Sequence, residues 1–301
     1  MVDIQRVDEG LWMLDVEQFG VTQYASVYLL AGDDPALVET GTSLEVGHVL
    51  AGLQAAGVSP GEIAWIFVTH VHLDHAGGAG TLLSHMPRAR VVVHARGARY
   101  LQDPTKLLAS VRQATGHMAD KYGTAEPIPP ERIVTPDDGD VFDLGERRLR
   151  AVDTPGHAPH HLCYFEEGAG WLFTGDAAGT WRKGMLLPTT PPPNFDLQTW
   201  LSTIERLETV HPKMILYTHF GANREAQSAL QSYRKVLADW VERVEGVWRG
   251  SGRDVEATVR ALLEDPELQS WPYNEHAPQA ELEICVRGVV HYLNRREAEG
   301  E

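Results

Sequence analysis

The sequence contains few cysteines, few basic residues and no long apolar run. Only Cys163 and Cys285 are present among 301 residues, which excludes a disulfide scaffold, and we expect both to be buried free thiols in a reducing cytoplasm. No apolar run approaches the roughly 20 residues that span a bilayer, so no membrane partner is expected. The first six residues show no basic stretch followed by an apolar segment, so we expect no secretory signal and a cytoplasmic location.

Basic residues are outnumbered by acidic ones. The 26 lysines and arginines face 42 aspartates and glutamates, which gives a formal net charge of −16. Such a surface repels phosphate backbones, and no basic cluster offsets it, so no nucleic-acid partner is expected. The hydrophobic share of 43% is enough for a sizeable core in one large domain or two small ones.

Side chains that bind metals are concentrated in residues 69–78. The segment contains four of them within six positions: His70, His72, Asp74 and His75. It follows the apolar run 64–68, which is short and rich in β-branched and aromatic residues, as a buried strand would be. Imidazole and carboxylate are ligands of divalent metals such as zinc. The sequence therefore predicts a metal-binding loop at the end of a strand.

Three later strand-like runs end in the same kind of side chain. His157 lies shortly after the run 148–152, Asp176 after 171–173, and His219 after 214–217. Chance would scatter such residues over both ends of the strands. We interpret their occurrence at one end as a single shared site.

These motifs resemble the metallo-β-lactamase superfamily over about Val27 to Gly221. The pattern of that family is complete here: His70, His72, Asp74, His75, His157, Asp176 and His219. The resemblance implies a first metal on His70, His72 and His157. It implies a second metal on Asp74, His75 and His219, with Asp176 bridging the two. The phrases at 154–161 and 173–176 look most similar to the glyoxalase II and acyl-homoserine lactonase branch.

The resemblance also implies residues that support the ligands. Glu39 stands where the family usually has aspartate, and we expect it to hold the metal loop through hydrogen bonds. His161 is expected to support the ligands in the same way. His160 replaces a more usual glycine, and whether it faces the pocket is left open. His94, alone at a strand end, is interpreted as structural.

The fold class implied by the family is α/β, a four-layer αββα sandwich of two facing sheets with helices on both outer surfaces. We expect residues 1–223 to form this core, with a helical insert at about 97–130. The insert is either packing or a lid with pocket residues such as Tyr100, His117 or Tyr122. Residues 224–301 are expected to form a helical extension, because apolar positions from 226 to 247 recur in steps of three and four. This extension is expected to pack on the core or on a partner subunit, as in a possible homodimer.

A stiff extended loop with three successive prolines, at 181–193, begins five residues after Asp176. It is expected to form a pocket wall, although an interface or plain packing is also compatible with it. The residues expected to contact a small-molecule substrate are Trp181, Met185, Tyr217 and Phe220.

Two divalent cations within ~4 Å share a water and lower its pKa toward 7. We therefore predict a metal-dependent hydrolase in which a metal-bound hydroxide attacks a small ester, lactone or thioester. Zinc is the expected metal, with iron or manganese as alternatives, and Asp74 is placed to orient the hydroxide or take up a proton. Few basic residues lie near the motifs, which disfavours phosphodiesters.

Two other classes remain open. One is a redox enzyme, because the superfamily includes mononuclear-iron persulfide dioxygenases with most of the same ligands. The other is a non-catalytic metal-binding protein on the same fold, which the complete ligand set disfavours. Flavodiiron proteins usually have glutamate at the position of His72 and add a flavin domain for which the chain has no room.

Overall fold

The computed structural model describes residues 3–273 and 278–300. The side chains of residues 117, 278 and 279 also lie outside the described part, and His117 of the expected lid is one of them. No described helix has the length and apolar character that crossing a bilayer requires. Cys163 and Cys285 are buried free thiols, as predicted.

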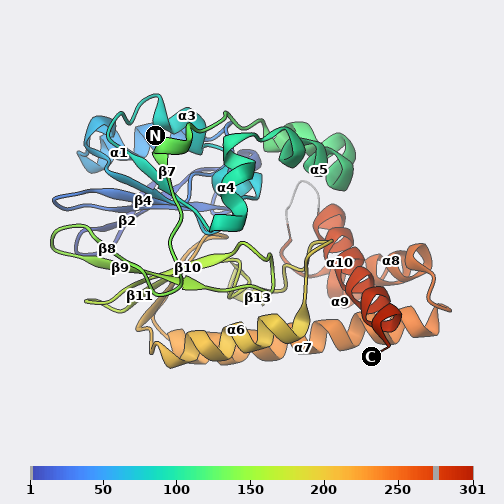
Figure 1. The fold of residues 1–301 in the computed structure, drawn as a ribbon. Coiled ribbons are helices and arrows are strands. Elements are labelled where there is room, and N and C mark those ends of the chain that lie inside the picture. The colour runs from blue at the N-terminus through green and yellow to red at the C-terminus, as the bar shows by residue number, and fades with distance from the viewer. Residues whose placement is uncertain (1–2, 274–277, 301) are drawn as a thin grey trace.

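Two sheets lie face to face in the middle of the molecule (Figure 1). The first has the order β1-β2-β3-β4-β5-β6-β7, formed by Ile4–Asp8, Leu11–Asp15, Ser26–Leu30, Ala36–Val38, Trp65–Phe67, Arg90–Val92 and Ile133–Val134. The second has the order β15-β14-β11-β10-β9-β8, formed by Ala222–Asn223, Met214–Tyr217, Trp171–Gly175, Leu162–Glu166, Arg148–Asp153 and Val141–Asp143. A separate hairpin pairs β12 (Thr180–Arg182) with β13 (Met185–Leu187).

The sheets are held together by large apolar side chains on their facing surfaces. Tyr28 and Phe67 of the first sheet are buried against Phe173 and Tyr164 of the second. The ring centroids of these pairs lie 5.5 Å and 5.1 Å apart, in the edge-to-face geometry that aromatic rings prefer. Strand alternation sends the opposite face of each sheet outward, where it needs a cover of helices.

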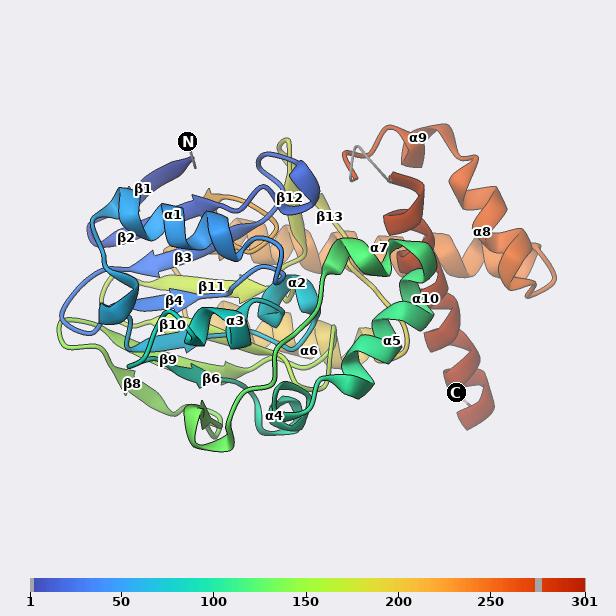
Figure 2. The ribbon, with the colours of Figure 1, turned by 90° about the horizontal axis from the view of Figure 1, so that it is seen from above.

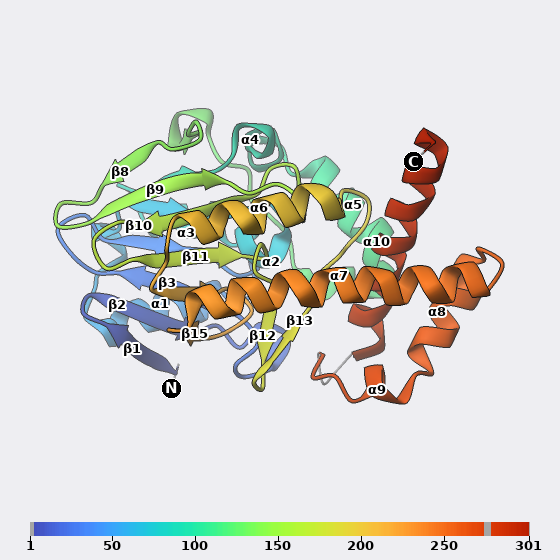
Figure 3. The ribbon, with the colours of Figure 1, turned by 90° about the horizontal axis from the view of Figure 1, so that it is seen from below.

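Helices provide that cover on both sides. Figure 2 shows α1 (Val46–Ala56) and α3 (Ala79–Leu83) over the first sheet. Figure 3 shows α6 (Leu197–Thr209) and α7 (Ala226–Gly250) over the second. The predicted four-layer αββα architecture is therefore confirmed. The remaining short helices of the core are α2 (Leu73–Ala76) and the 3₁₀ turns at Gln18–Gly20, Pro60–Glu62 and Pro130–Arg132.

Two helical regions lie at one end of the sandwich (Figures 1 and 2). The insert forms α4 (Ala95–Gln102), α5 (Thr105–Thr115) and a 3₁₀ segment (Gly116–Tyr122). The C-terminal region forms α8 (Val255–Leu263), α9 (Pro266–Gln269) and α10 (Pro278–Glu299), beyond the long helix α7. Helix α10 packs very closely on the loop after β13, since a Cβ atom at Gly288 would lie only 1.7 Å from the carbonyl oxygen of Thr190.

Backbone hydrogen bonds join the two sheets at the edge where the ligand-bearing strands end. The amide of Leu162 donates to the carbonyl of Thr69 over 2.7 Å, and the amide of Ser26 donates to the carbonyl of Thr218 over 2.7 Å. Because Thr69 and Thr218 directly precede His70 and His219, these bonds bring ligand loops from both sheets to one place.

Candidate metal centre

The structure brings all seven sequence-predicted ligand residues together. Three overlapping groups have ligand atoms within 4.8 Å of one another: His70, His72 and His157; His70, His75 and Asp176; Asp74, His75 and His219. The first and third are the two triads that the family pattern implies. We call them the histidine triad and the aspartate triad.

The histidine triad is a cluster of uncharged nitrogens. Nδ1 of His72 lies 2.8 Å from Nε2 of His70 and 3.2 Å from Nε2 of His157. Burial, together with the neighbouring imidazoles, lowers the pKa of His70 and of His72 well below the usual range. Neutral rings with converging nitrogens are the form in which histidine binds a metal.

The aspartate triad has the opposite electrostatic character. Oδ2 of Asp74 lies 3.6 Å from Nε2 of His75 and 3.7 Å from Nε2 of His219. Burial opposes a charge on His75, but Asp74, Asp176 and Glu39 raise its pKa well above the usual range. A divalent cation would take the place of the proton that these carboxylates attract.

Asp176 faces both triads, one with each oxygen. Its Oδ2 lies 3.2 Å from Nε2 of His157, while its Oδ1 lies 3.2 Å from Nε2 of His219 and 3.4 Å from Nε2 of His75. Burial would raise the pKa of Asp176, but His157, His75 and His219 hold it well below the usual range. Within the described residues, Asp176 Oδ1 and His75 Nε2 are buried without a hydrogen-bond partner. Such orphaned atoms fit bound cations, because a buried polar atom is otherwise costly.

Glu39 connects the ligand loops. Its Oε1 accepts hydrogen bonds from the hydroxyls of Thr69 (2.6 Å) and Thr218 (3.0 Å) and lies 3.0 Å from Nδ1 of His75. Its Oε2 accepts from the amide of Thr69 at 3.2 Å. The glutamate thus occupies the supporting position expected from the sequence and orients the ring of His75, a candidate ligand.

His161 supports the bridging residue. Its Nε2 accepts a hydrogen bond from the amide of Asp176 over 3.2 Å, so its Nδ1 carries the proton and donates to the hydroxyl of Thr154 over 2.7 Å. His94 lies outside the centre, and its Nδ1 accepts from the amide of Arg96, which caps helix α4.

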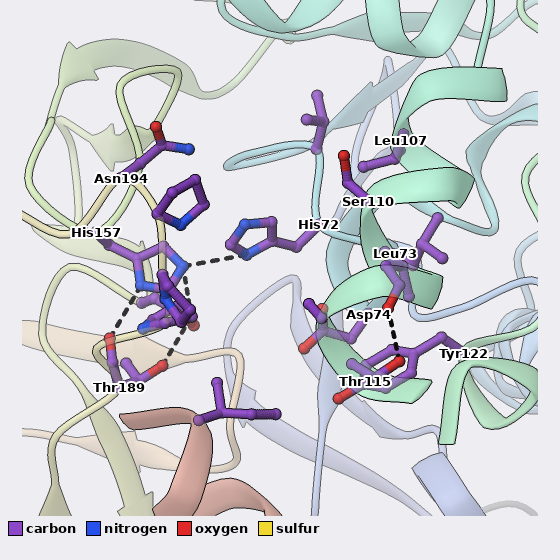
Figure 4. A pocket seen from close by; sticks show the side chains of 18 of the residues that line it. His72, Leu73, Asp74, Leu107, Ser110, Thr115, Tyr122, His157, Thr189 and Asn194 are labelled. Carbon is purple, nitrogen blue, oxygen red and sulfur yellow. Dashed lines mark hydrogen bonds and ion pairs between the residues drawn. The ribbon is translucent and has the colours of Figure 1, made fainter. Parts of the chain in front are cut away.

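A cavity of about 760 Å³ opens over the ligands (Figure 4). His72, Asp74, His157, Asp176 and His219 all reach it. Its walls come from three further regions: the insert (Tyr100, Leu107, Val111, Tyr122), the proline loop (Pro188, Pro191, Pro192, Pro193) and helix α10 (Glu281, Ile284, Cys285). The insert therefore lines the cavity, and the C-terminal region contributes to it as well.

The four expected substrate contacts are not among the residues that line this cavity. Trp181 stacks on buried Tyr217 with ring centroids 6.2 Å apart, Met185 is an exposed residue of the hairpin, and Phe220 packs against the core between the sheets. Strand alternation explains the difference for Trp181, since its neighbours Thr180 and Arg182 line the cavity instead.

His160, whose orientation the sequence left open, lines the cavity, with an exposed fraction of 8% and a pKa that burial lowers to about 4. Arg182 is a lining residue that was not identified from the sequence: it pairs with Glu281 of α10 at 2.9 Å and lies 3.9 Å from the ring centroid of Tyr24, whose hydroxyl also bonds to Glu281. No sequence signal marks this contact, because its members are up to 257 positions apart.

Residues 20–219 match the pattern of the metallo-beta-lactamase superfamily. A metallo-beta-lactamase fold-containing protein of Sulfurisphaera tokodaii is 29% identical over 217 residues, which are 70% of this chain and 78% of that protein. A crystal structure of an archaeal superfamily protein from Sulfolobus tokodaii has a TM-score of 0.71 and 24% identity, with 93% of this chain and 98% of that chain covered.

Two further relatives carry names that state an activity. A hydroxyacylglutathione hydrolase of Rhodobacter capsulatus is 31% identical over 60% of this chain and 57% of its own length. An atrochrysone carboxyl ACP thioesterase of Aspergillus chevalieri is 29% identical over 51% of this chain and 40% of its own length. The chain thus spans about half the length of these two relatives. Together, the matched residues 20–219, the two-sheet fold and the complete ligand set show that the chain belongs to the metallo-beta-lactamase superfamily.

Proposed function

We propose that the protein is a metal-dependent hydrolase that cleaves a carbonyl ester, lactone or thioester at a centre of two divalent cations. The observation that carries this proposal is the position of Asp176, which presents one oxygen to each triad. Zinc suits the imidazole and carboxylate donors, with iron and manganese as alternatives. The histidine triad would hold one cation and the aspartate triad the other, with Asp176 shared.

Bound at this centre, the cations would lower the pKa of a water and polarise a substrate carbonyl. The residues of the chain would provide a proton acceptor, the orientation of the ligands and the walls of the cavity. Asp74 lines the cavity, and its 19% exposed side chain is placed to accept a proton from the attacking water. Glu39 holds the ring of His75 in the orientation that binding requires. The apolar walls of the cavity exclude bulk water and accommodate the substrate.

Two observations favour carbonyl substrates. The named relatives are a thioesterase and a hydroxyacylglutathione hydrolase, both of which act on acyl groups. The cavity walls formed by α5, the proline loop and α10 are largely apolar, which suits an acyl or ring group. We also propose that the substrate is a small molecule and that the protein acts in the cytoplasm.

Metal analysis and a substrate panel test the proposal together. Protein purified without chelator or added metal is expected to hold two metals per chain and to hydrolyse aryl esters, lactones or thioesters faster than bis-aryl phosphodiesters. If the protein holds one iron per chain, consumes oxygen in the presence of persulfides and hydrolyses none of the esters, a dioxygenase function would replace the proposed hydrolase. Equal or faster turnover of the phosphodiester would overturn the carbonyl assignment.

A further inference from the structure

Two arginines lie on the lip of the cavity, on the side of His72. Arg96 and Arg99 are three positions apart on α4, so they lie on the same face of the helix, and both line the cavity. Both are exposed. No carboxylate of residues 3–273 or 278–300 forms an ion pair with either one. The chain has a net charge of −16, so two arginines at the cavity without an acidic partner among the described residues indicate a binding role.

The position of α4 relative to the metal loop is fixed by close packing. A Cβ atom at Gly97 would lie 2.8 Å from a methyl group of Val71 and 3.7 Å from Cβ of His160. The helix therefore rests directly on the ligand loop through a residue that has no side chain. Since Gly97 lies between the two arginines, this contact holds both of them at the rim.

A row of rings leads from the ligands to Arg99. The ring of His160 lies 6.2 Å from that of His72 and 6.4 Å from that of Tyr100. The guanidinium of Arg99 lies 4.7 Å from the ring of Tyr100 and donates a hydrogen bond to its hydroxyl. The rings of Tyr100 and His160 thus lie between the guanidinium of Arg99 and His72. A group bound at Arg99 is therefore expected to be a part of the substrate other than the carbonyl that is cleaved.

We propose that Arg96 and Arg99 form a subsite for an anionic group of the substrate, remote from the cleaved bond. This inference rests on the proposed function and names a narrower substrate class: an ester or thioester whose distant end carries a carboxylate or a phosphate. Guanidinium groups bind both anions through paired charged hydrogen bonds. Binding at this distance would orient the acyl group over the metal ligands without contact with the reacting atoms.

Matched thioesters that differ only in the distant charge test the subsite. One pair uses a peptide thiol with a free C-terminal carboxylate or with an amide, and the other uses phosphopantetheine or pantetheine, all with the same acyl group. For at least one pair, the anionic member is expected to have a kcat/KM roughly tenfold higher, through KM and at low ionic strength. The pair that shows the preference identifies the anion.

The double variant R96Q/R99Q is expected to bring the ratio of anionic to neutral kcat/KM close to one. The matched control is Lys106→Gln, which removes a charge from an exposed residue of the neighbouring helix α5 outside the cavity lining. This control should keep the wild-type ratio. A wild-type ratio near one in both pairs, or a ratio that the double variant retains, would overturn the inference.

Binding measurements test the subsite independently of the proposed hydrolase function. If no thioester of the panel is hydrolysed by metal-loaded protein, the proposed function fails and the subsite is tested by calorimetry with the free thiols. Tighter binding of the carboxylate or phosphate thiol than of its neutral match, lost in R96Q/R99Q, supports the subsite. Equal affinities for the charged and neutral thiols would reject it.

Discussion

The two triads of the centre lie side by side, yet they differ in how they are prepared for a cation. The histidine triad consists of buried neutral imidazoles, and burial lowers the pKa of each of them. The aspartate triad includes a carboxylate and a histidine whose pKa is raised by three acidic neighbours. Cation binding by the histidine triad therefore depends on imidazoles that stay unprotonated. Cation binding by the aspartate triad depends on negative charge that the cation compensates. Asp176 is a member of neither triad, but it presents one carboxylate oxygen to each.

The largest effect is expected from Asp176→Ala, which removes the carboxylate that faces both triads. Metal affinity should fall at both positions, because each loses a carboxylate oxygen, and kcat should fall roughly 10³-fold. Metal content, steady-state kinetics and circular dichroism check this. Two tightly bound metals in a folded, inactive variant would contradict the assignment of Asp176 as a bridge.

Glu39→Gln is expected to weaken metal binding by the aspartate triad but not by the histidine triad. The carboxylate accepts from two threonine hydroxyls and lies beside Nδ1 of His75, and an amide cannot replace all these contacts. Metal affinity of the aspartate triad should fall roughly 10- to 100-fold, while the histidine triad keeps its metal. Titration with a chelator should remove the two metals in two steps. The chelator concentrations of these steps should lie further apart in the variant than in the wild type.

A suitable control for this variant is Glu45→Gln. Glu45 is also buried, but its carboxylate accepts from the amide of Thr42 and is not bonded to a ligand histidine. The Glu45→Gln variant should lose its two metals at the same chelator concentrations as the wild type. Loss of both metals together in Glu39→Gln would show that the triads do not respond separately.

Lowering the pH should reduce the stability of the metal-free protein, mainly because of His160 and the histidine triad. The pKa of His160 is lowered to about 4, and burial holds those of His70 and His72 well below their usual range, whereas an unfolded histidine titrates near 6.5. Below pH ~6.5 the unfolded chain takes up protons that the folded chain does not. Stability should therefore fall as the pH falls from 6.5 toward 4, by up to ~1.4 kcal/mol per pH unit for each such histidine.

His75 contributes with the opposite sign. Its raised pKa adds stability that is fully present below pH ~6.5 and is lost as the pH rises through the folded value. Urea unfolding of chelator-treated protein between pH 7 and 5 measures the net slope, and His160→Asn should make it shallower. A stability that rises on acidification would mean that the aspartate triad dominates.

The smallest effect is expected from His94→Ala. This histidine lies outside both triads and caps α4, so its loss should cost about 1 kcal/mol of stability and no metal. Elemental analysis and thermal unfolding check both parts. If the variant lost metal as fully as Asp176→Ala, the list of ligands would be wrong.

The convergence of the seven candidate ligands was predictable because the family pattern fixes both their types and their order. His70 to His75 form one local motif, and the other three each follow a strand that ends at the same edge. The role expected for Glu39 also matches its contacts, despite the departure from aspartate. Periodicity likewise indicated α7, which spans Ala226–Gly250.

The cavity walls could not be predicted in the same way. An amphipathic pattern shows that a helix buries one face, but it does not show which surface that face covers. Helix α10 reaches the cavity through contacts such as Arg182 with Glu281, which are 99 positions apart. At Trp181 the expected loop is a short hairpin, and its alternation turns the tryptophan away from the cavity and Arg182 toward it.

The close contact between Gly288 and Thr190 also bears on how the protein is made. All seven ligand residues precede position 220, whereas α10, which rests on the loop at Thr190, begins at Pro278. A ribosome that synthesises the chain from its N-terminus releases the complete ligand set before the last wall of the cavity exists. During that interval the ligands are without the α10 wall, and metal ions can reach them from a side that the finished protein keeps covered.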